Sequence, residues 1–207
     1  MKTYTPNQIY HVYNRGNNKQ TIFFNRDNYI FFLNKIRQNV RPHCEILSYC
    51  LMPNHFHFLI YSDERTAEPV SPLEAVARIN NSQPIKTKFS EAWRIALSSY
   101  TQAINRQEQR TGSLFTQNTK NKQVSDEWMS FDYRHCCFSY IHQNPISSNL
   151  VKKAEDWEFS SYRDYLGLRN GTLCNQPLAY QLMGFDKAYF DELHFKKWDK
   201  KIIDGIF

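Results

Sequence analysis

The segment ILSYCLMPNHFHFLIY, residues 46–61, contains two short apolar runs separated by a turn. Pro53 and Asn54 are residue types that favour tight connections, and the runs on either side, Ile46–Leu51 and His55–Tyr61, are rich in aromatic and aliphatic side chains. Two apolar runs this close together are typical of a buried β-hairpin. The hairpin is the centre from which the other elements of the chain are placed.

Before the hairpin, the sequence predicts one strand and one helix. Ile9–Tyr13 reads as a first strand, and residues 14–17 read as a turn. Asp27 is expected to cap a helix, because apolar residues recur at helical spacing from Ile30 to Ile36.

After the hairpin, residues 62–72 hold acidic residues and prolines and read as a loop. Apolar residues then recur every three or four positions from Phe89 to Ile104, which predicts a long amphipathic helix. Thr111-Gly112 is expected to break this helix, and residues 114–124 read as a fourth strand, polar and partly exposed.

A further helix is expected to begin at Ser125, with acidic residues suited to its first turn, and to end at Pro145. Residues 157–165 form a short aromatic segment that we expect to pack back on the body. The order β-α-β-β-α-β followed by a helix predicts an α+β fold, a ferredoxin-like four-stranded antiparallel sheet with helices on one face. We expect one domain over residues 1–167 and a C-terminal helical extension over residues 168–207.

The composition is that of a globular, mildly basic protein. Of 207 residues, 41% are hydrophobic and 15% aromatic, which is enough for a core, and the net charge is +6. Residues 83–124 contain seven basic and two acidic residues, which favours a phosphate-binding surface, although an ordinary solvated face has the same pattern. The basic residues are Lys86, Lys88, Arg94, Arg106, Arg110, Lys120 and Lys122.

The five cysteines are odd in number and include no C-x-x-C pair, so neither a disulfide framework nor a thiolate zinc site is indicated. Residues 1–14 lack the apolar region of a secretion signal, and no run approaches membrane-spanning length. We expect a cytoplasmic protein with no membrane partner.

The third strand carries the pattern His55-Phe56-His57. Side chains two apart on a strand point to the same face, so both imidazoles project together while Phe56 faces the other side. Two histidines at this spacing can ligate one divalent cation, although a pair with ordinary structural partners is the commoner outcome for so short a motif. A third ligand must come from elsewhere, since the neighbouring sequence offers nothing better than Asn54.

The segment YIHQNP, residues 140–145, is the second candidate for chemistry. Tyr140 and Asn144 are four apart, so on a helix they share a face. Asn144 could lend its carbonyl oxygen to a metal, and Gln143 is the rival ligand. Tyr133, two turns earlier on nearly the same face, competes with Tyr140. His135 and His142 are expected on the helix surface rather than as ligands.

Together these segments resemble the IS200-like transposase family, whose members are HUH-type tyrosine nucleases, including its REP-associated tyrosine transposase branch. The resemblance covers about residues 8 to 167 and rests on five segments in order. They are YHVYNRG at 10–16, LMPNHFHFLI at 51–60, SYTQAINRQEQRTGSLF at 99–115, YIHQNP at 140–145 and WEFSSYRDYLG at 157–167.

The resemblance implies a metal-dependent enzyme that nicks and rejoins single-stranded, hairpin-containing DNA through a 5′-phosphotyrosine intermediate. It implies that His55 and His57 bind Mg²⁺ or Mn²⁺ and that Tyr140 is the nucleophile. Asn144 matches the third ligand, at a position where several relatives carry Gln. The resemblance also allows a homodimer, because some relatives share active sites between subunits.

Arg15, Arg106, Arg110, Lys120 and Lys122 are candidate phosphate contacts. Aromatic residues at 13, 115 and 128 are candidates for base stacking, with core packing as the simpler role. Two other readings stay open: a domesticated nucleic-acid-binding protein of the same fold that does not cleave, and a phosphodiesterase that uses activated water.

Overall fold

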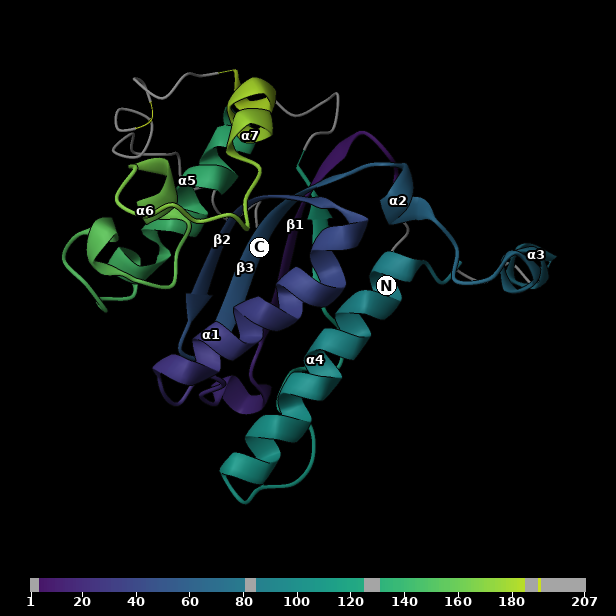
Figure 1. The fold of residues 1–207 in the computed structure, drawn as a ribbon, viewed down its shortest axis with the longest axis horizontal. Helices are drawn as coiled ribbons and strands as arrows, with labels where there is room; N and C mark the ends of the chain where they lie inside the picture. Colours follow the sequence, from purple (N-terminus) through teal and green to yellow (C-terminus); the bar gives the residue numbers. More distant parts are fainter. Residues whose placement is uncertain (1–3, 81–84, 125–130, 185–189, 191–207) are drawn as a thin grey trace.

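The computed structural model describes residues 4–80, 85–124, 131–184 and 190. It forms an α+β fold in which a four-stranded antiparallel sheet is covered by helices (Figure 1). The strands are β1 Gln8–Arg15, β2 Glu45–Met52, β3 His55–Ser62 and β4 Lys120–Gln123. The α-helices are α1 Arg26–Lys35, α2 Glu64–Ala67, α3 Pro72–Asn80, α4 Lys88–Gln107, α5 Phe131–Ser147, α6 Tyr162–Tyr165 and α7 Gln176–Met183. Among the shorter helices, a π-helical turn, Ile36–Val40, continues α1.

The strand order is β2-β3-β1-β4, with every neighbouring pair antiparallel. This is the order of a ferredoxin-like sheet, so the predicted fold class is confirmed. The hairpin of β2 and β3 is also confirmed, and β3 is a central strand between β2 and β1. In this register His57 lies opposite Tyr13 of β1 and Cys50 of β2.

The sheet separates two apolar clusters. On one face, α1 and α4 contribute buried residues such as Phe32, Trp93 and Tyr100, which pack with Phe56 and Phe58 of β3. On the other face, α5 and the C-terminal segments pack against alternate residues of the same strands. Figure 1 shows α1 and α4 across one side of the sheet and α5, α6 and α7 grouped together away from them. The two histidines of β3 belong to the α5 side.

Several predicted boundaries are wrong for local reasons. The N-cap of α1 is Asn25, whose Oδ1 accepts from the Asn28 backbone N at 3.0 Å, and not Asp27, which lies in the first turn. The expected loop over 62–72 contains α2, capped by Asp63. The strand β1 continues to Arg15, through part of the predicted turn.

The region around α4 also differs from expectation. The helix ends at Gln107, earlier than the predicted break at Thr111-Gly112, and β4 covers only Lys120–Gln123 of the expected 114–124. Before α4, the sequence reading missed α3, which extends away from the body of the fold in Figure 1.

Pro145 lies inside α5 and does not end it, because the helix continues to Ser147. A proline in the last turns removes one backbone donor, and this helix is held by tertiary packing on the sheet. The predicted start of this helix, at Ser125, lies outside the described residues.

The aromatic segment at 157–165 packs on the body as predicted. The indole Nε1 of Trp157 donates to the Leu51 carbonyl at 3.0 Å, and the ring of Phe159 stacks on Tyr29 with centroids 3.8 Å apart. Beyond it, Ala179 and Met183 of α7 are buried in the same apolar cluster as α5. The division at residue 167 stays a prediction. Within the described residues, no helix combines the length and apolar character needed to cross a bilayer.

Candidate metal and tyrosine site

The two imidazoles of β3 lie on the face of the sheet that α5 covers. His55 is half-buried and His57 is buried, and their ring centroids are 4.9 Å apart with the planes nearly perpendicular. They share this face because they are two apart on an extended strand, while Phe56 between them is buried in the opposite cluster. The alternation expected from the sequence is therefore present in the structure.

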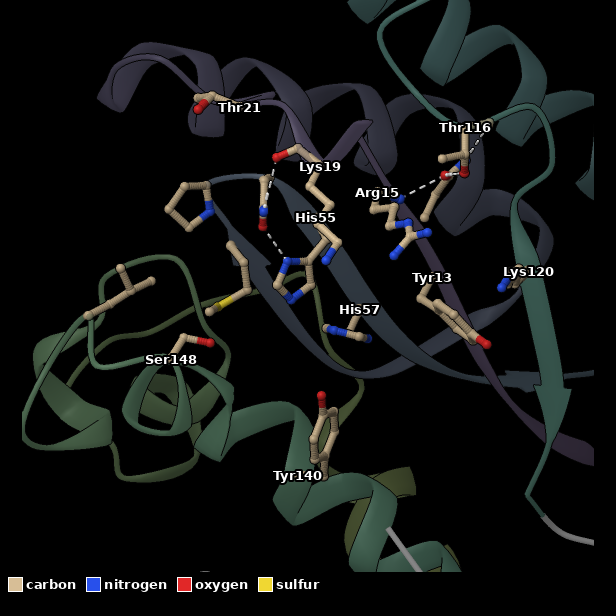
Figure 2. A pocket seen from close by; sticks show the side chains of 15 residues that line it. Tyr13, Arg15, Lys19, Thr21, His55, His57, Thr116, Lys120, Tyr140 and Ser148 are labelled. Atoms are coloured by element: carbon tan, nitrogen blue, oxygen red, sulfur yellow. Dashed lines mark hydrogen bonds between the residues drawn. The ribbon is translucent and has the colours of Figure 1, made fainter. Parts of the chain in front are cut away.

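The helix α5 brings two further candidate residues to these imidazoles. The ring of Tyr140 lies edge-on to His57, with centroids 5.7 Å apart and an interplanar angle of 89°. Oδ1 of Asn144, one turn later, is 3.4 Å from Nε2 of His55. Figure 2 shows the Tyr140 hydroxyl directed from the helix toward the two histidine rings.

These side chains form a donor set that fits a divalent cation. Imidazole nitrogens with an amide oxygen are suitable ligands for Mn²⁺ as well as Mg²⁺. Ligand atoms about 2.1 Å from one cation can be up to about 4.2 Å apart, so the 3.4 Å between His55 Nε2 and Asn144 Oδ1 is compatible with both binding one ion. Among the described residues, no three His, Cys, Asp or Glu side chains form a metal-binding group.

Burial shifts the pKa values of three side chains in this site. It lowers the pKa of His57 well below the ordinary value, with further lowering from the neighbouring His11 and His55, and it also lowers the pKa of His55. Both rings are therefore neutral at neutral pH, the form that ligates metals. Burial raises the pKa of Tyr140 to about 12, while the Asn144 side chain lowers it, so the phenol keeps its proton at neutral pH.

The imidazoles and Tyr140 line a cavity of about 800 Å³. Arg15, Lys19 and Lys120 line the same cavity and supply three cationic groups (Figure 2). The ammonium of Lys120 also lies 5.9 Å from the ring centroid of Tyr13, another lining residue. A cavity with positive charges beside neutral imidazoles suits a phosphate-bearing ligand.

The other predicted basic residues lie elsewhere. Lys122 places its ammonium 5.6 Å from the ring centroid of Tyr133 and does not line the cavity. Arg106 is near the C-terminal end of α4, and Arg110 follows it, donating to the Ser113 carbonyl at 3.4 Å; neither lines the cavity.

At the other end of α4, three members of the basic run form ion pairs with acidic neighbours. These pairs are Lys86–Glu91, Lys88–Glu68 and Arg94–Glu91. Of the basic residues in this run, Lys120 alone lines the cavity, and a DNA-binding role for the other six stays a prediction.

Among the competing candidates, the geometry favours Asn144 over Gln143 and Tyr140 over Tyr133. Asn144 is buried with its oxygen near His55, whereas Gln143 is half-buried. Tyr140 lines the cavity, whereas Tyr133 of α5 is buried in the apolar cluster on this side of the sheet and does not line it.

The expectation that His135 and His142 lie on the helix surface is wrong. Both are buried: Nε2 of His135 is 2.6 Å from the Met183 carbonyl, and Nε2 of His142 is 2.7 Å from Ser161 Oγ. The C-terminal segments cover this face of α5, which sequence periodicity does not reveal.

The sequence reading missed His11 and Lys19 as residues of this region. His11 lies two positions before Tyr13 on β1, so the alternation of that strand could have placed it on the imidazole face. Of the proposed stacking residues, Tyr13 lines the cavity and Phe115 is buried in the other cluster; Trp128 lies outside the described residues.

Comparison with protein-family models finds no match, and comparison with curated proteins finds none either. Among solved structures, the chain is similar to a REP-associated tyrosine transposase bound to a REP hairpin. The two are 18% identical, with a TM-score of 0.57, and the match covers 81% of this chain and 84% of that chain. At this identity the likeness shows a shared fold.

Proposed function

We propose that this protein is a metal-dependent tyrosine endonuclease and strand transferase that acts on single-stranded, hairpin-containing DNA. The observation that carries the proposal is the position of Tyr140, whose hydroxyl points at the paired imidazoles of His55 and His57 within one cavity. The fold shared with a transposase bound to a REP hairpin supports the same assignment.

In this proposal Tyr140 is the nucleophile. Its Oη bonds to the phosphorus of a DNA phosphate while the bond from that phosphorus to the 3′-oxygen breaks. The phenol loses its proton, and the departing 3′-oxygen gains one. The product is a 5′-phosphotyrosine link and a free 3′-hydroxyl, which conserves a phosphodiester so that the strand can be rejoined without ATP.

His55, His57 and Asn144 would hold the cation, Mg²⁺ or Mn²⁺, through two ring nitrogens and an amide oxygen. A cation bound there offsets the negative charge that develops on the phosphate during attack. The neutral state of both rings, which burial favours, keeps their lone pairs available for ligation.

Arg15, Lys19 and Lys120 would contact the DNA backbone, because they line the cavity that holds the nucleophile. Tyr13 on the same wall is available for base stacking. The nucleophile and the three proposed ligands lie on two elements of the same chain, β3 and α5.

A nicking assay on hairpin-bearing single-stranded DNA with Mn²⁺ tests the proposal. We expect cleavage, a covalent protein–DNA species that maps to Tyr140, and loss of both in Tyr140→Phe. Tyr133→Phe is the matched control, because it removes a phenol from the same helix, and it should leave cleavage intact. His57→Ala should abolish cleavage while keeping much of the DNA binding, since phosphate contacts dominate affinity.

Other outcomes point to the other readings. DNA binding with no cleavage by the wild-type protein would indicate a binding protein that keeps only the fold. Cleavage that survives in Tyr140→Phe, without a covalent adduct, would indicate attack by water.

A further inference from the structure

A third histidine, His11 of β1, contacts the proposed metal ligand His57 on the same face of the sheet. His11, in the middle of β1, is fully buried, and its Nε2 is 2.9 Å from Nδ1 of His57. The two rings are stacked, with centroids 5.0 Å apart and planes inclined by 21°. In the sheet register His57 lies opposite Tyr13, so His11 is its diagonal neighbour on the same face.

A hydrogen bond between two neutral imidazoles ties their tautomers together. Each neutral ring has one N–H and one lone pair, so one ring must donate while the other accepts. If Nδ1 of His57 donates to Nε2 of His11, then Nε2 of His57 is the nitrogen that carries a lone pair. Metal-binding histidines commonly have their second nitrogen fixed in this way by a protein partner.

His55, the other proposed imidazole ligand, also has a hydrogen-bond partner at Nδ1, the side chain of Asn54. Here a backbone carbonyl fixes which atom donates the hydrogen bond and which accepts it. Nδ2 of Asn54 donates to the Lys19 carbonyl at 3.2 Å, which can only accept. Oδ1 of Asn54 therefore faces Nδ1 of His55, 2.6 Å away, and accepts its proton. The lone pair of His55 is left on Nε2, the nitrogen that lies near Asn144.

We propose that His11 and Asn54 are positioning residues that hold His57 and His55 as Nδ1–H tautomers, so that both rings present Nε2 to a divalent cation. This inference rests on the proposed function for the role of the cation. It adds two residues that would not contact the metal or the DNA phosphate themselves.

The first measurement is made on the metal-free wild-type protein, by long-range ¹H–¹⁵N correlation spectra of its histidine rings. We expect His55 and His57 to show a protonated Nδ1 and an unprotonated Nε2. His11→Gln keeps a side-chain carbonyl that can accept from His57, and it should preserve this pattern. His11→Leu removes the acceptor, and it should shift His57 toward the Nε2–H form.

The second measurement is Mn²⁺ affinity, read from the EPR signal of free Mn²⁺. His11→Leu should bind Mn²⁺ about tenfold or more weakly, whereas His11→Gln should stay within about threefold of wild type. An Nε2–H tautomer at His57 in the wild type, or a His11→Leu variant that binds Mn²⁺ normally, would overturn the inference.

The two proposals fail differently. Absence of Mn²⁺ binding by the wild type would refute the metal role in the proposed function, while the tautomers of the metal-free protein still decide whether His11 and Asn54 set them. If His11→Leu does not fold, the wild-type and His11→Gln spectra carry the test, and a protonated Nε2 at His57 in either refutes it.

Discussion

Ser160 and Ser161 offer a matched pair of substitutions that tests how α5 is fastened to the sheet. Both serines are fully buried, but they have different partners. Ser161 Oγ accepts from the backbone N of Tyr49 on β2 at 2.9 Å and lies 2.7 Å from Nε2 of His142 on α5. Ser160 Oγ accepts a longer bond from the Tyr162 backbone N, at 3.2 Å, and also hydrogen-bonds with the Cys50 thiol.

The expected magnitudes follow from these contacts. Ser161→Ala deprives a buried backbone N–H and a buried imidazole nitrogen of this partner, at about 1–3 kcal/mol for each group, so the free energy of unfolding should fall by about 2–6 kcal/mol. Ser160→Ala should cost about 1 kcal/mol. Urea denaturation followed by circular dichroism measures both. A loss in Ser161→Ala no larger than that in Ser160→Ala would refute the assignment of Ser161 as the link between β2 and α5.

Three further predictions concern stability, thiol reactivity and DNA binding. Arg169 donates hydrogen bonds of 2.6 and 3.1 Å to Asp164, whose side chain is 1% exposed. Arg169→Met leaves that buried carboxylate without its ion-pair partner and should lower the free energy of unfolding by about 3 kcal/mol in the same urea assay. Adding Asp164→Asn to this variant should recover part of the loss. Burial raises the pKa of four cysteine thiols, those of Cys44, Cys50, Cys137 and Cys174. Because a raised pKa lowers the thiolate fraction, the native protein at pH 8 should react with a thiol reagent far more slowly than the urea-unfolded protein. Rapid labelling of these four cysteines in the native protein would contradict this prediction. Lys120 lines the cavity, so Lys120→Gln should weaken the binding of single-stranded DNA and reduce the magnitude of the slope of log binding constant against log salt concentration by about one. The ammonium of Lys88 is paired with Glu68, so the control Lys88→Gln should change neither the affinity nor the slope.

The hairpin and the helix α4 could be predicted because their signals are local. The two runs of the hairpin are joined by Pro53-Asn54, and α4 repeats apolar residues at helical spacing from Phe89 to Ile104. The same-face placement of His55 and His57 follows from the alternation of one strand. These features depend on residues close together in the sequence.

The other features depend on contacts between distant segments. The hydrogen bond between His11 and His57 depends on the register in which β1 pairs with β3. The burial of His142 depends on the later segment that holds Ser161 packing against α5. Pro145 was expected to end a helix because local preference disfavours it there, yet packing against the sheet outweighs that preference. Single-sequence patterns do not contain these pairings.

The apolar face of the sheet fixes the direction of the proposed ligands. On β3, a slip of one residue would exchange the two faces and turn His55 and His57 into the cluster beneath α1 and α4. Phe56 resists that slip, because it is fully buried and stacks on Trp93 with centroids 5.6 Å apart and planes 6° from parallel. Turning Phe56 out would forfeit roughly 1.5–3 kcal/mol of side-chain burial and would place a polar imidazole in an apolar cluster. The register of the site is therefore set by aromatic residues that contact neither the imidazole cavity nor Tyr140.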